Sequence, residues 1–236
     1  MSEKSRADHR APNLRDILDR LRSRYRVSLE EFVAPRAIAE GAKAFEILVG
    51  IVLSQNTSDR NAIKAFEELR KVLGGSIDPQ KVLSTPIEVV ENAIKCAGQQ
   101  RRRARILVEL AKRFLENPNL VEELKRLSAE EARAKLMKLP GIGPKTADVF
   151  VLMYLRKPTF PIDTHIRRVA ERMGIGRDYE VIRKHFLEMW RTSGLDLEDL
   201  IELHLLLIQH GRETCRARNP LCRECVLRDF CASSSP

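Results

Sequence analysis

The sequence has few aromatic residues and no long apolar segment. Tryptophan, tyrosine and phenylalanine make up 5% of its 236 residues, and the longest uninterrupted apolar run, Val149 to Leu155, has seven residues. Because a helix needs about 20 apolar residues to span a bilayer, we expect no membrane-spanning segment. Residues 2–10 are polar and charged with no apolar stretch behind them, so no signal peptide is expected either. Both absences predict a cytoplasmic protein.

A strand pattern is also missing. Every periodic segment has its apolar residues at helical spacing and the connections are short, which predicts an all-α fold. A chain of this length, with 43% hydrophobic residues, can form one large or two small domains. Pro35 is expected to interrupt the chain. The expected helices span approximately residues 13–25, 44–53, 60–73, 86–95, 106–114, 129–136, 144–154, 164–170, 179–190 and 196–210.

Acidic residues are too few to balance the basic ones. The chain has 42 lysines and arginines against 33 aspartates and glutamates, which gives a net charge of +9. A polyanion is the natural partner of such a surface. An acidic membrane surface, or solubility alone, are the alternatives.

Cysteine is scarce except near the end of the chain. Four of the five cysteines lie within seventeen residues, in the pattern Cys215-x6-Cys222-x2-Cys225-x5-Cys231. In a reducing compartment such a group indicates a metal or cluster site and not disulfides. Four thiolates can also hold zinc in a tetrahedron, so sulfur ligation alone leaves the metal open. The fifth cysteine, Cys96, is expected in the core.

The chain is organised around the segment Leu139–Ala147, Leu-Pro-Gly-Ile-Gly-Pro-Lys-Thr-Ala. Gly141 and Gly143 predict a tight hairpin with backbone angles that a side chain would forbid, and Pro144 suits the first position of a helix. The N–H groups and the positive dipole end of that helix predict a phosphate site. A lysine beside that dipole end loses its proton more readily, and a neutral amine is a nucleophile, so Lys145 is a candidate. The alternative is an ordinary helical corner with a solvated lysine.

A second motif follows the hairpin. Asp163 lies eighteen residues after Lys145, within Pro161-Ile162-Asp163-Thr164-His165. Together with the hairpin and the cysteine spacing, it makes the chain resemble, over about residues 40–231, the endonuclease III branch of the helix-hairpin-helix DNA glycosylases. The resemblance implies a [4Fe–4S] cluster on the four cysteines, Lys145 as the nucleophile and Asp163 as the carboxylate near the sugar. By its position Asp163 is also a helix N-cap, and the two roles are compatible.

The resemblance further implies two helical domains with a DNA-binding cleft between them. A helical barrel that contains the helix-hairpin-helix is expected over residues 40–157. A discontinuous cluster domain is expected from residues 13–39 together with residues 158–236, which contain the [4Fe–4S] loop. Residues 1–12 are polar, basic and without periodicity, and we expect a disordered arm there.

Several polar segments are candidate DNA contacts. In the family, a glutamine of the segment Leu53–Asp59 enters the gap left by the extruded base, and the matching residue here is Asn56. A wedge residue of the family matches Gln99. The three arginines at 101–103 are either a phosphate contact or a solvated face. The predicted DNA-binding residues are Gln55, Asn56, Gln99, Arg101, Arg102, Arg103, Gly141, Gly143, Thr146, Arg216 and Arg218.

The resemblance implies a bifunctional DNA glycosylase and AP lyase that removes oxidised pyrimidines in base excision repair. Its partner would be double-stranded DNA with a damaged base or an abasic site, bound by a monomer away from any membrane. A carboxylate stabilises the positive charge that builds on the sugar, and an amine that attacks C1′ forms an imine, which permits β-elimination. The alternatives are a mismatch glycosylase that removes thymine or uracil opposite guanine, and a non-catalytic DNA-binding iron–sulfur sensor.

Overall fold

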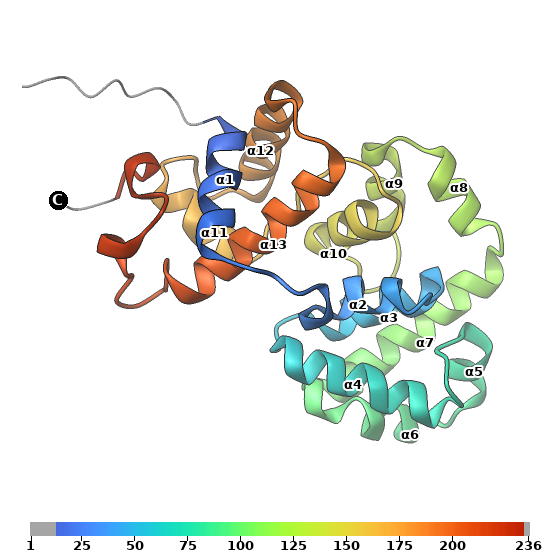
Figure 1. Ribbon diagram of the computed structural model, residues 1–236. Coiled ribbons are helices and arrows are strands. Elements are labelled where there is room, and N and C mark those ends of the chain that lie inside the picture. Colours follow the sequence, from blue (N-terminus) through green and yellow to red (C-terminus); the bar gives the residue numbers. More distant parts are fainter. Residues whose placement is uncertain (1–12, 234–236) are drawn as a thin grey trace, which may run out of the picture. The chain divides into compact units, whose positions relative to one another are not determined.

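The computed structural model describes residues 13–233, and the arm predicted at residues 1–12 lies outside this range. Within it the chain forms thirteen α-helices and no strand, which confirms the all-α class (Figure 1). None of these helices is long and apolar enough to cross a membrane. The helical spacing of apolar residues therefore identified the fold class correctly.

Contacts along the chain divide it into two units. The hairpin unit comprises residues 27–161, and the cluster unit comprises the chain up to Arg26 together with the residues from Ile162 onward. The sequence predicted the two boundaries at 39/40 and 157/158 instead. The first boundary differs because α2 (Val33–Ala39) packs on α3 (Ala44–Leu53) inside the hairpin unit.

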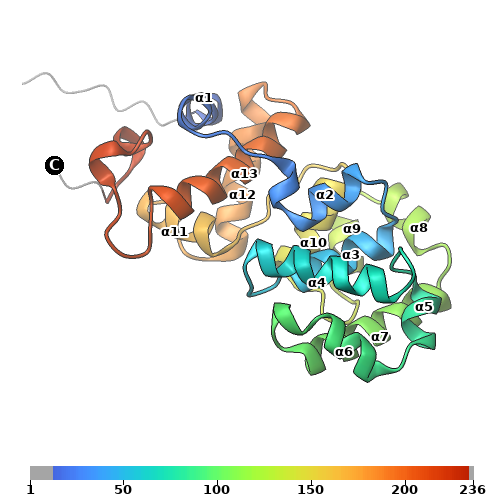
Figure 2. The same cartoon turned by 60° about the horizontal axis from the view of Figure 1, so that its bottom comes forward.

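The hairpin unit is built around α3. All ten residues of α3 are buried, which confirms the buried helix predicted at 44–53. It packs against α2, α4 (Asp59–Val72), α7 (Gln100–Glu116) and α10 (Pro144–Val149). Figure 2 shows α6 (Ile87–Ala93) beside α4 and α7. The remaining helices of this unit are α5 (Pro79–Ser84), α8 (Leu120–Arg126) and α9 (Ala129–Leu136).

Local sequence signals were correct at some helix ends and wrong at others. Ser128 caps α9 through a full capping box with Glu131. The box predicted at Thr85 does not form, because the Thr85 hydroxyl donates to the Lys81 carbonyl at 2.7 Å. Pro35 does not interrupt the chain but lies in the first turn of α2, where a backbone N–H is not needed. Helices α5 and α8 were not predicted, since six or seven residues show little periodicity.

A buried ion pair fixes the two helices that the hairpin joins. Arg133 of α9 donates from Nε to Asp148 Oδ2 at 3.1 Å, and Asp148 of α10 is fully buried. The Thr159 hydroxyl donates to Asp148 Oδ1 at 2.5 Å. After α10 the chain continues through a π-helical turn, Phe150–Tyr154, where the sequence predicted one regular helix. The ion pair therefore holds α10 against α9 near the end of α10.

The cluster unit is built around α13 (Leu197–Glu213). Both α1 (Leu14–Arg24) and α11 (Thr164–Arg172) pack on α13, and α12 (Tyr179–Ser193) contacts α1 and α11. The approach of α11 to α13 is closest at Gly211, where a Cβ would lie 2.7 Å from the Cβ of His165. A residue without a side chain is therefore needed at this crossing.

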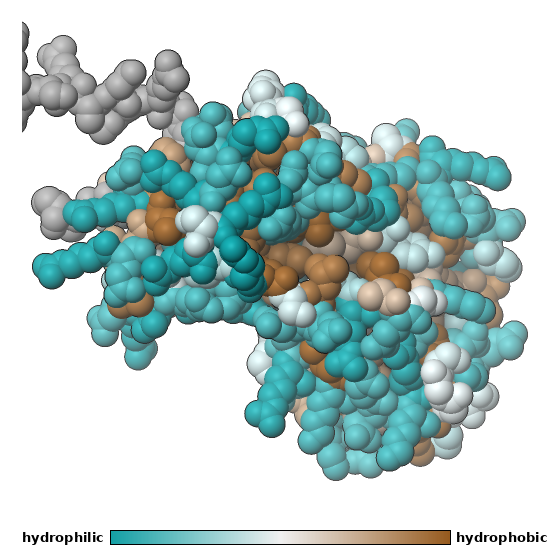
Figure 3. Space-filling model, viewed as in Figure 1, coloured by the Kyte–Doolittle hydropathy of each residue, from teal (hydrophilic) through white to brown (hydrophobic). Residues whose placement is uncertain are grey.

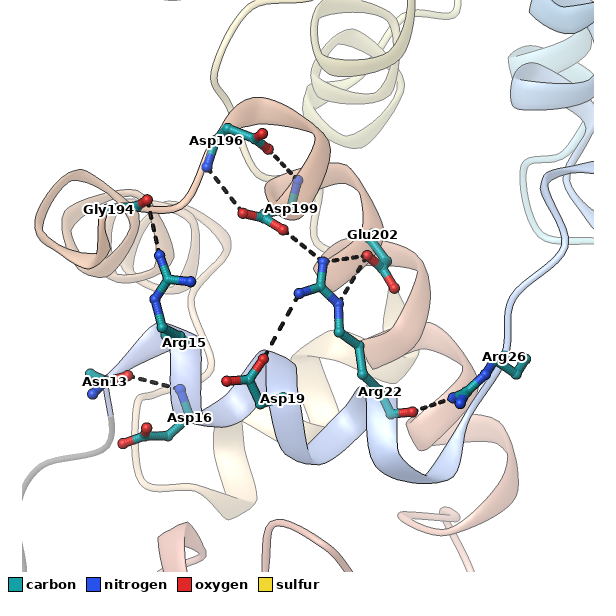
Figure 4. A network of polar contacts seen from close by, with 10 residues as sticks. All are labelled: Asn13, Arg15, Asp16, Asp19, Arg22, Arg26, Gly194, Asp196, Asp199 and Glu202. Carbon is teal, nitrogen blue, oxygen red and sulfur yellow. Dashed lines mark hydrogen bonds and ion pairs between the residues drawn. The ribbon is translucent and has the colours of Figure 1, made fainter.

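The arginines of α1 attach it to the rest of the cluster unit. Figure 4 shows Arg15 donating to the Gly194 carbonyl at 3.0 Å. In the same view, Arg22 bonds to Asp199 and Glu202 of α13 at 2.6 Å each. Hydrophilic side chains nevertheless predominate over α1 and α4 on the face shown in Figure 3. These contacts place the N-terminal helix beside residues that lie about 180 positions later in the chain.

We predict that Asp148→Ala lowers the free energy of unfolding by about 3–5 kcal/mol, because it removes the carboxylate that balances the buried guanidinium of Arg133. Chemical denaturation of the cluster-loaded protein measures the change. The exposed residue Lys138, close by in the chain, supplies the control, and Lys138→Ala is expected to alter stability by no more than about 0.5 kcal/mol. Equal losses in the two variants would contradict a stabilising role for the ion pair.

Candidate functional site

The hairpin needs a glycine at only one of its two positions. Gly141 has a φ of +74°, and a Cβ there would lie 2.4 Å from Cγ2 of Ile106. Gly143 has a φ of −92° and a ψ of 179°, so the special backbone angle predicted for it is wrong. No described atom lies within 4 Å of the place where its Cβ would be. The role of Gly143 is therefore to leave space beside the start of α10.

Lys145 is the second residue of α10 and is half-buried. Gly143 is the N-cap and Pro144 the first helical residue, as the sequence predicted. The N–H groups of a first helical turn have no partner within the helix and point out of its end. The side chain of Lys145 thus begins at a helix end that is suited to bind an anion.

Gln55 connects the hairpin to the end of α3. Its Nε2 donates to the Gly141 carbonyl at 3.0 Å and to the Thr146 hydroxyl at 2.9 Å. Thr146 is buried, with 3% of its surface exposed. Both side chains thus bond inside the hairpin unit, and DNA binding by Gln55 and Thr146 remains a prediction. Their contact fixes the hairpin.

Arg103 is also an internal residue, although it was predicted to contact DNA. It is 4% exposed, and its guanidinium donates to the carbonyl groups of Val52 at 3.3 Å, Leu53 and Gln55. These carbonyls lie at the end of α3, where a helix leaves its last C=O groups without partners. Burial lowers the pKa of Arg103, and the neighbouring Arg102 lowers it further. Arg103 thus joins the start of α7 to the end of α3.

The remaining polar candidates of the hairpin unit are exposed. Asn56 and Gln99 both have a φ of +50°, which is unusual for residues with a side chain. Each lies just before a helix, and the Gln99 Oε1 accepts a hydrogen bond from Arg102 at 3.3 Å. Arg101 and Arg102 are exposed in the first turn of α7. For these four residues DNA binding remains a prediction.

Asp163 is the N-cap of α11 and is half-buried. Its Oδ1 accepts from the Ile166 N–H at 2.7 Å, and its Oδ2 has no hydrogen-bond partner among the described residues. The preceding residue is also fixed, because the Ile162 N–H donates to the Tyr179 hydroxyl at 3.3 Å. Capping therefore holds the carboxylate in place and leaves one oxygen for other contacts. Asp163 belongs to the cluster unit and Lys145 to the hairpin unit.

The four cysteines follow α13 in a loop with two 3₁₀ turns. The Cys215 N–H donates to the His210 carbonyl at 2.8 Å, so the loop begins at the end of α13. All four thiols are half-buried. Burial raises the pKa of the Cys225 thiol, and the nearby sulfurs of Cys215, Cys222 and Cys231 raise it further. Four thiols in one short loop suit a sulfur-ligated cluster by their chemistry, and its iron would favour the thiolate form.

Arg172, the last residue of α11, bonds to both ends of the cysteine loop. Its Nη1 donates to Cys215 Sγ at 3.2 Å and to the Arg216 carbonyl at 2.7 Å. Its own carbonyl accepts from the Ser233 N–H at 3.0 Å. Arg216 and Arg218, predicted to contact DNA, are exposed on this loop. Arg172 thus contacts the first cysteine and connects the two ends of the loop.

A buried histidine lies on the other side of the loop. His210 Nε2 is 3.8 Å from Cys225 Sγ, and its Nδ1 is 3.0 Å from the Tyr25 hydroxyl. Burial and, to a smaller extent, the charge of Arg24 lower the pKa of His210 to about 4. The ring of Tyr25 meets that of His210 edge to face, with centroids 5.8 Å apart. Tyr25 is the C-cap residue of α1.

Sequence reasoning missed Arg172, His210 and Tyr25, as well as the internal role of Arg103. Their positions on helix faces resemble those of ordinary surface or core residues, and their partners lie far away in the sequence. A weak signal was present for Arg172 and Arg103, since each is close to a motif that the sequence singled out. Cys96 is half-buried, with its thiol 3.6 Å from the Asn61 carbonyl, so its predicted place in the core is wrong.

Known proteins match both units. Residues 49–192 match the HhH-GPD superfamily of base excision DNA repair proteins, and residues 215–231 match the iron–sulfur binding domain of endonuclease III. The chain is 35% identical to endonuclease III of Sulfolobus acidocaldarius over 215 residues, which cover 90% of this chain and 92% of that protein. It is 31% identical to endonuclease III of Escherichia coli over 218 residues, 92% and 93% of the two chains.

A solved structure shares the fold over nearly the whole chain. It shows a trapped covalent intermediate between an endonuclease III and DNA, with a TM-score of 0.72 and 27% sequence identity. The similarity covers 94% of this chain and 95% of that one.

The fold, the hairpin and these matches define a base excision repair DNA glycosylase of the HhH-GPD superfamily. Within that superfamily the chain belongs to the endonuclease III family. The predicted resemblance and the predicted [4Fe–4S] cofactor are confirmed, and the zinc alternative is not supported.

We predict that Gln55→Ala loosens the hairpin. The change removes two hydrogen bonds, each worth about 1 kcal/mol, so amide hydrogen exchange over residues 141–146 should accelerate up to about thirtyfold. Hydrogen exchange with mass spectrometry on the cluster-loaded protein measures this directly. The adjacent Asn56 is exposed, and Asn56→Ala should leave exchange in the hairpin unchanged. The same acceleration in both variants would argue against Gln55 as the specific tether.

Proposed function

We propose that this protein is a bifunctional DNA glycosylase and AP lyase, with Lys145 as the nucleophile. The observation that carries the proposal is the position of Lys145 at the second residue of the helix that follows the hairpin. The trapped covalent DNA intermediate of the related endonuclease III supports a covalent step in this family member as well. A purely hydrolytic glycosylase needs only a carboxylate and water, whereas an amine that attacks C1′ also nicks the strand.

Asp163 supplies the negative charge in the first chemical step. Cleavage of the N-glycosidic bond builds positive charge on the sugar, and a fixed carboxylate nearby stabilises this oxocarbenium-like state. The hydrogen bond from the Ile166 N–H holds Asp163 Oδ1, and Oδ2 faces the developing charge. The base leaves with the bonding electron pair and takes up a proton, and the lone pair of the Lys145 amine forms the new bond to C1′. The nitrogen then loses a proton and the C1′–O4′ bond breaks, with O4′ taking up a proton, which opens the sugar ring and gives the imine. Loss of the 2′ proton from this imine expels the 3′ phosphate.

The proposed substrate is duplex DNA that contains an oxidised pyrimidine. The reactive bond of a stacked nucleotide is out of reach, so the nucleotide must be flipped out, at a cost of a few kcal/mol. A damaged base loses less stacking energy, which favours its extrusion. The net charge of +9 supports binding to the phosphate backbone. Because DNA is the substrate, we place the protein inside the cell.

The proposed DNA contacts are the residues that remain exposed at the two motifs. The open space beside Gly143 and the N–H groups that follow it suit a phosphate, and Gly141 shapes the turn that presents them. Side chains for base or phosphate contacts are Asn56, Gln99, Arg101, Arg102, Arg216 and Arg218. The ligands that we propose for the cluster are Cys215, Cys222, Cys225 and Cys231. When bound, the cluster orders the loop that carries the last two arginines.

The lyase step is tested by trapping the imine with borohydride. On a duplex with an abasic site, the wild-type protein should form a covalent adduct and Lys145→Ala should form none, because the variant lacks the proposed nucleophile. Lys138→Ala, close by on an exposed residue, should trap like wild type. Asp163→Asn should still trap on abasic DNA but release a damaged base about a hundredfold more slowly. An undiminished adduct in Lys145→Ala would overturn the assignment.

The substrate is tested with a panel of duplexes in the same assay. Adducts on thymine glycol, with little on uracil or on a T·G mismatch, are expected for an enzyme that removes oxidised pyrimidines. A preference for the mismatch would identify the alternative mismatch glycosylase. An adduct on no duplex, the abasic one included, would contradict the lyase activity itself.

The cluster ligands are tested through the iron content. Cys225→Ala should lose most of the iron and the visible absorption of the cluster, because three thiolates hold a [4Fe–4S] cluster poorly. Cys96→Ala is the matched control, since it removes a half-buried thiol of the other unit, and its iron content should equal that of wild type. Four irons per chain in Cys225→Ala would remove this cysteine from the ligand set.

A further inference from the structure

A buried chain of polar contacts leads from α1 to the cysteine loop. The Tyr25 hydroxyl lies 2.6 Å from the Thr214 hydroxyl and 3.0 Å from His210 Nδ1, and His210 Nε2 lies 3.8 Å from Cys225 Sγ. Tyr25, His210 and Thr214 are 3%, 1% and 1% exposed. Water is therefore kept from all three, and each polar atom depends on the next one for its hydrogen bond.

The direction of each hydrogen bond in this series of contacts follows from the proposed cluster ligand at its end, Cys225. A cysteine that binds iron is a thiolate without a proton, so it only accepts, and His210 Nε2 must carry a hydrogen. A neutral ring with its proton on Nε2 has a bare Nδ1, which accepts from the Tyr25 O–H. The Tyr25 oxygen is then left as an acceptor for the Thr214 O–H. This assignment rests on the proposed role of Cys225 as a cluster ligand.

We propose that Tyr25 is a positioning residue for the [4Fe–4S] cluster, which fixes His210 as a hydrogen-bond donor to the sulfur of Cys225. Hydrogen bonds to the ligating sulfurs are among the features that set the potential of such clusters. The positive end of an N–H dipole offsets the negative charge that reduction adds, so this donor raises the reduction potential. Without the Tyr25 O–H, the bare Nδ1 of this tautomer would be buried without a donor, so the tautomer that donates to sulfur would be less favoured.

The contact of His210 with a cysteine sulfur differs from the second such contact in the loop, which Arg172 makes. Arg172 also donates to a cysteine sulfur, but its guanidinium has hydrogens on every nitrogen and needs no partner to orient it as a donor. His210 has two ring nitrogens, and the group at Nδ1 helps to decide which one carries the proton. Tyr25 therefore acts through His210, across 185 positions of sequence.

The test measures the cluster potential in the full-length, cluster-loaded protein by protein-film voltammetry. Tyr25→Phe keeps the ring and its edge-to-face packing, removes only the hydroxyl, and should shift the potential to more negative values with the iron content unchanged. Tyr154→Phe, which removes a hydroxyl in the hairpin unit, is the matched control and should not shift it. His210→Gln places an amide N–H near Nε2 and should stay closer to wild type than His210→Leu.

An unshifted potential in Tyr25→Phe with full iron would overturn the proposal, because a merely structural contact does not tune the cluster. If the variants lose iron, the proposal is tested on the wild-type protein by NMR of the histidine ring nitrogens. In protein labelled with ¹⁵N-histidine, the proposal requires the ring proton of His210 on Nε2, and a proton on Nδ1 alone overturns it.

The iron content of Cys225→Ala distinguishes the proposal for Tyr25 from the proposal that Cys225 is a cluster ligand. Iron retained there refutes the ligand assignment, whereas iron lost there with an unshifted Tyr25→Phe refutes only the role of Tyr25.

Discussion

The hydrogen bonds from the Arg103 guanidinium to the end of α3 are the contacts on which the hairpin unit depends. Helix α3 is buried along its whole length, so its last carbonyl groups cannot bond to water and need donors from the protein. Arg103 supplies them from the first turn of α7, at the cost of burying a charge. Gln55, at the same helix end, then donates to the hairpin. The start of α10, and with it Lys145, is therefore held by a chain of contacts that begins in the core.

In the cluster unit, too, an arginine donates hydrogen bonds to backbone carbonyl groups, here those of the cysteine loop. Arg172 donates from the end of α11 to the carbonyl groups and one sulfur of the cysteine loop. The residue that begins the same helix, Asp163, is a candidate for the chemistry. One short helix thus has the carboxylate at one end and the principal contact with the cysteine loop at the other. The nine residues of α11 thus connect the carboxylate to the contacts with the cysteine loop.

The polar residues predicted to bind DNA divide into two groups. Asn56, Gln99 and the arginines at 101, 102, 216 and 218 are exposed, whereas Gln55, Arg103 and Thr146 bond inside the hairpin unit. Both groups come from the same segments and have the same residue types. Amides and guanidinium groups suit a backbone carbonyl as well as a base edge or a phosphate, so composition cannot separate the two uses. Removing a residue of the second group would break internal contacts, so a loss of DNA binding in such a variant would not by itself identify a contact to DNA.

The sequence by itself determined the features that depend on neighbours in the chain. Helical spacing, the caps at Ser128 and Asp163, the positive φ of Gly141 and the spacing of the four cysteines all act over a few residues, and each was visible before the fold. Only the tertiary structure decided which polar side chains are internal, because their partners are backbone groups brought near from distant segments. The contact of Tyr25 with His210 is the clearest case. A tyrosine at the end of an N-terminal helix has no local signal for a role at the cysteine loop, and packing of α1 on α13 alone brings it there.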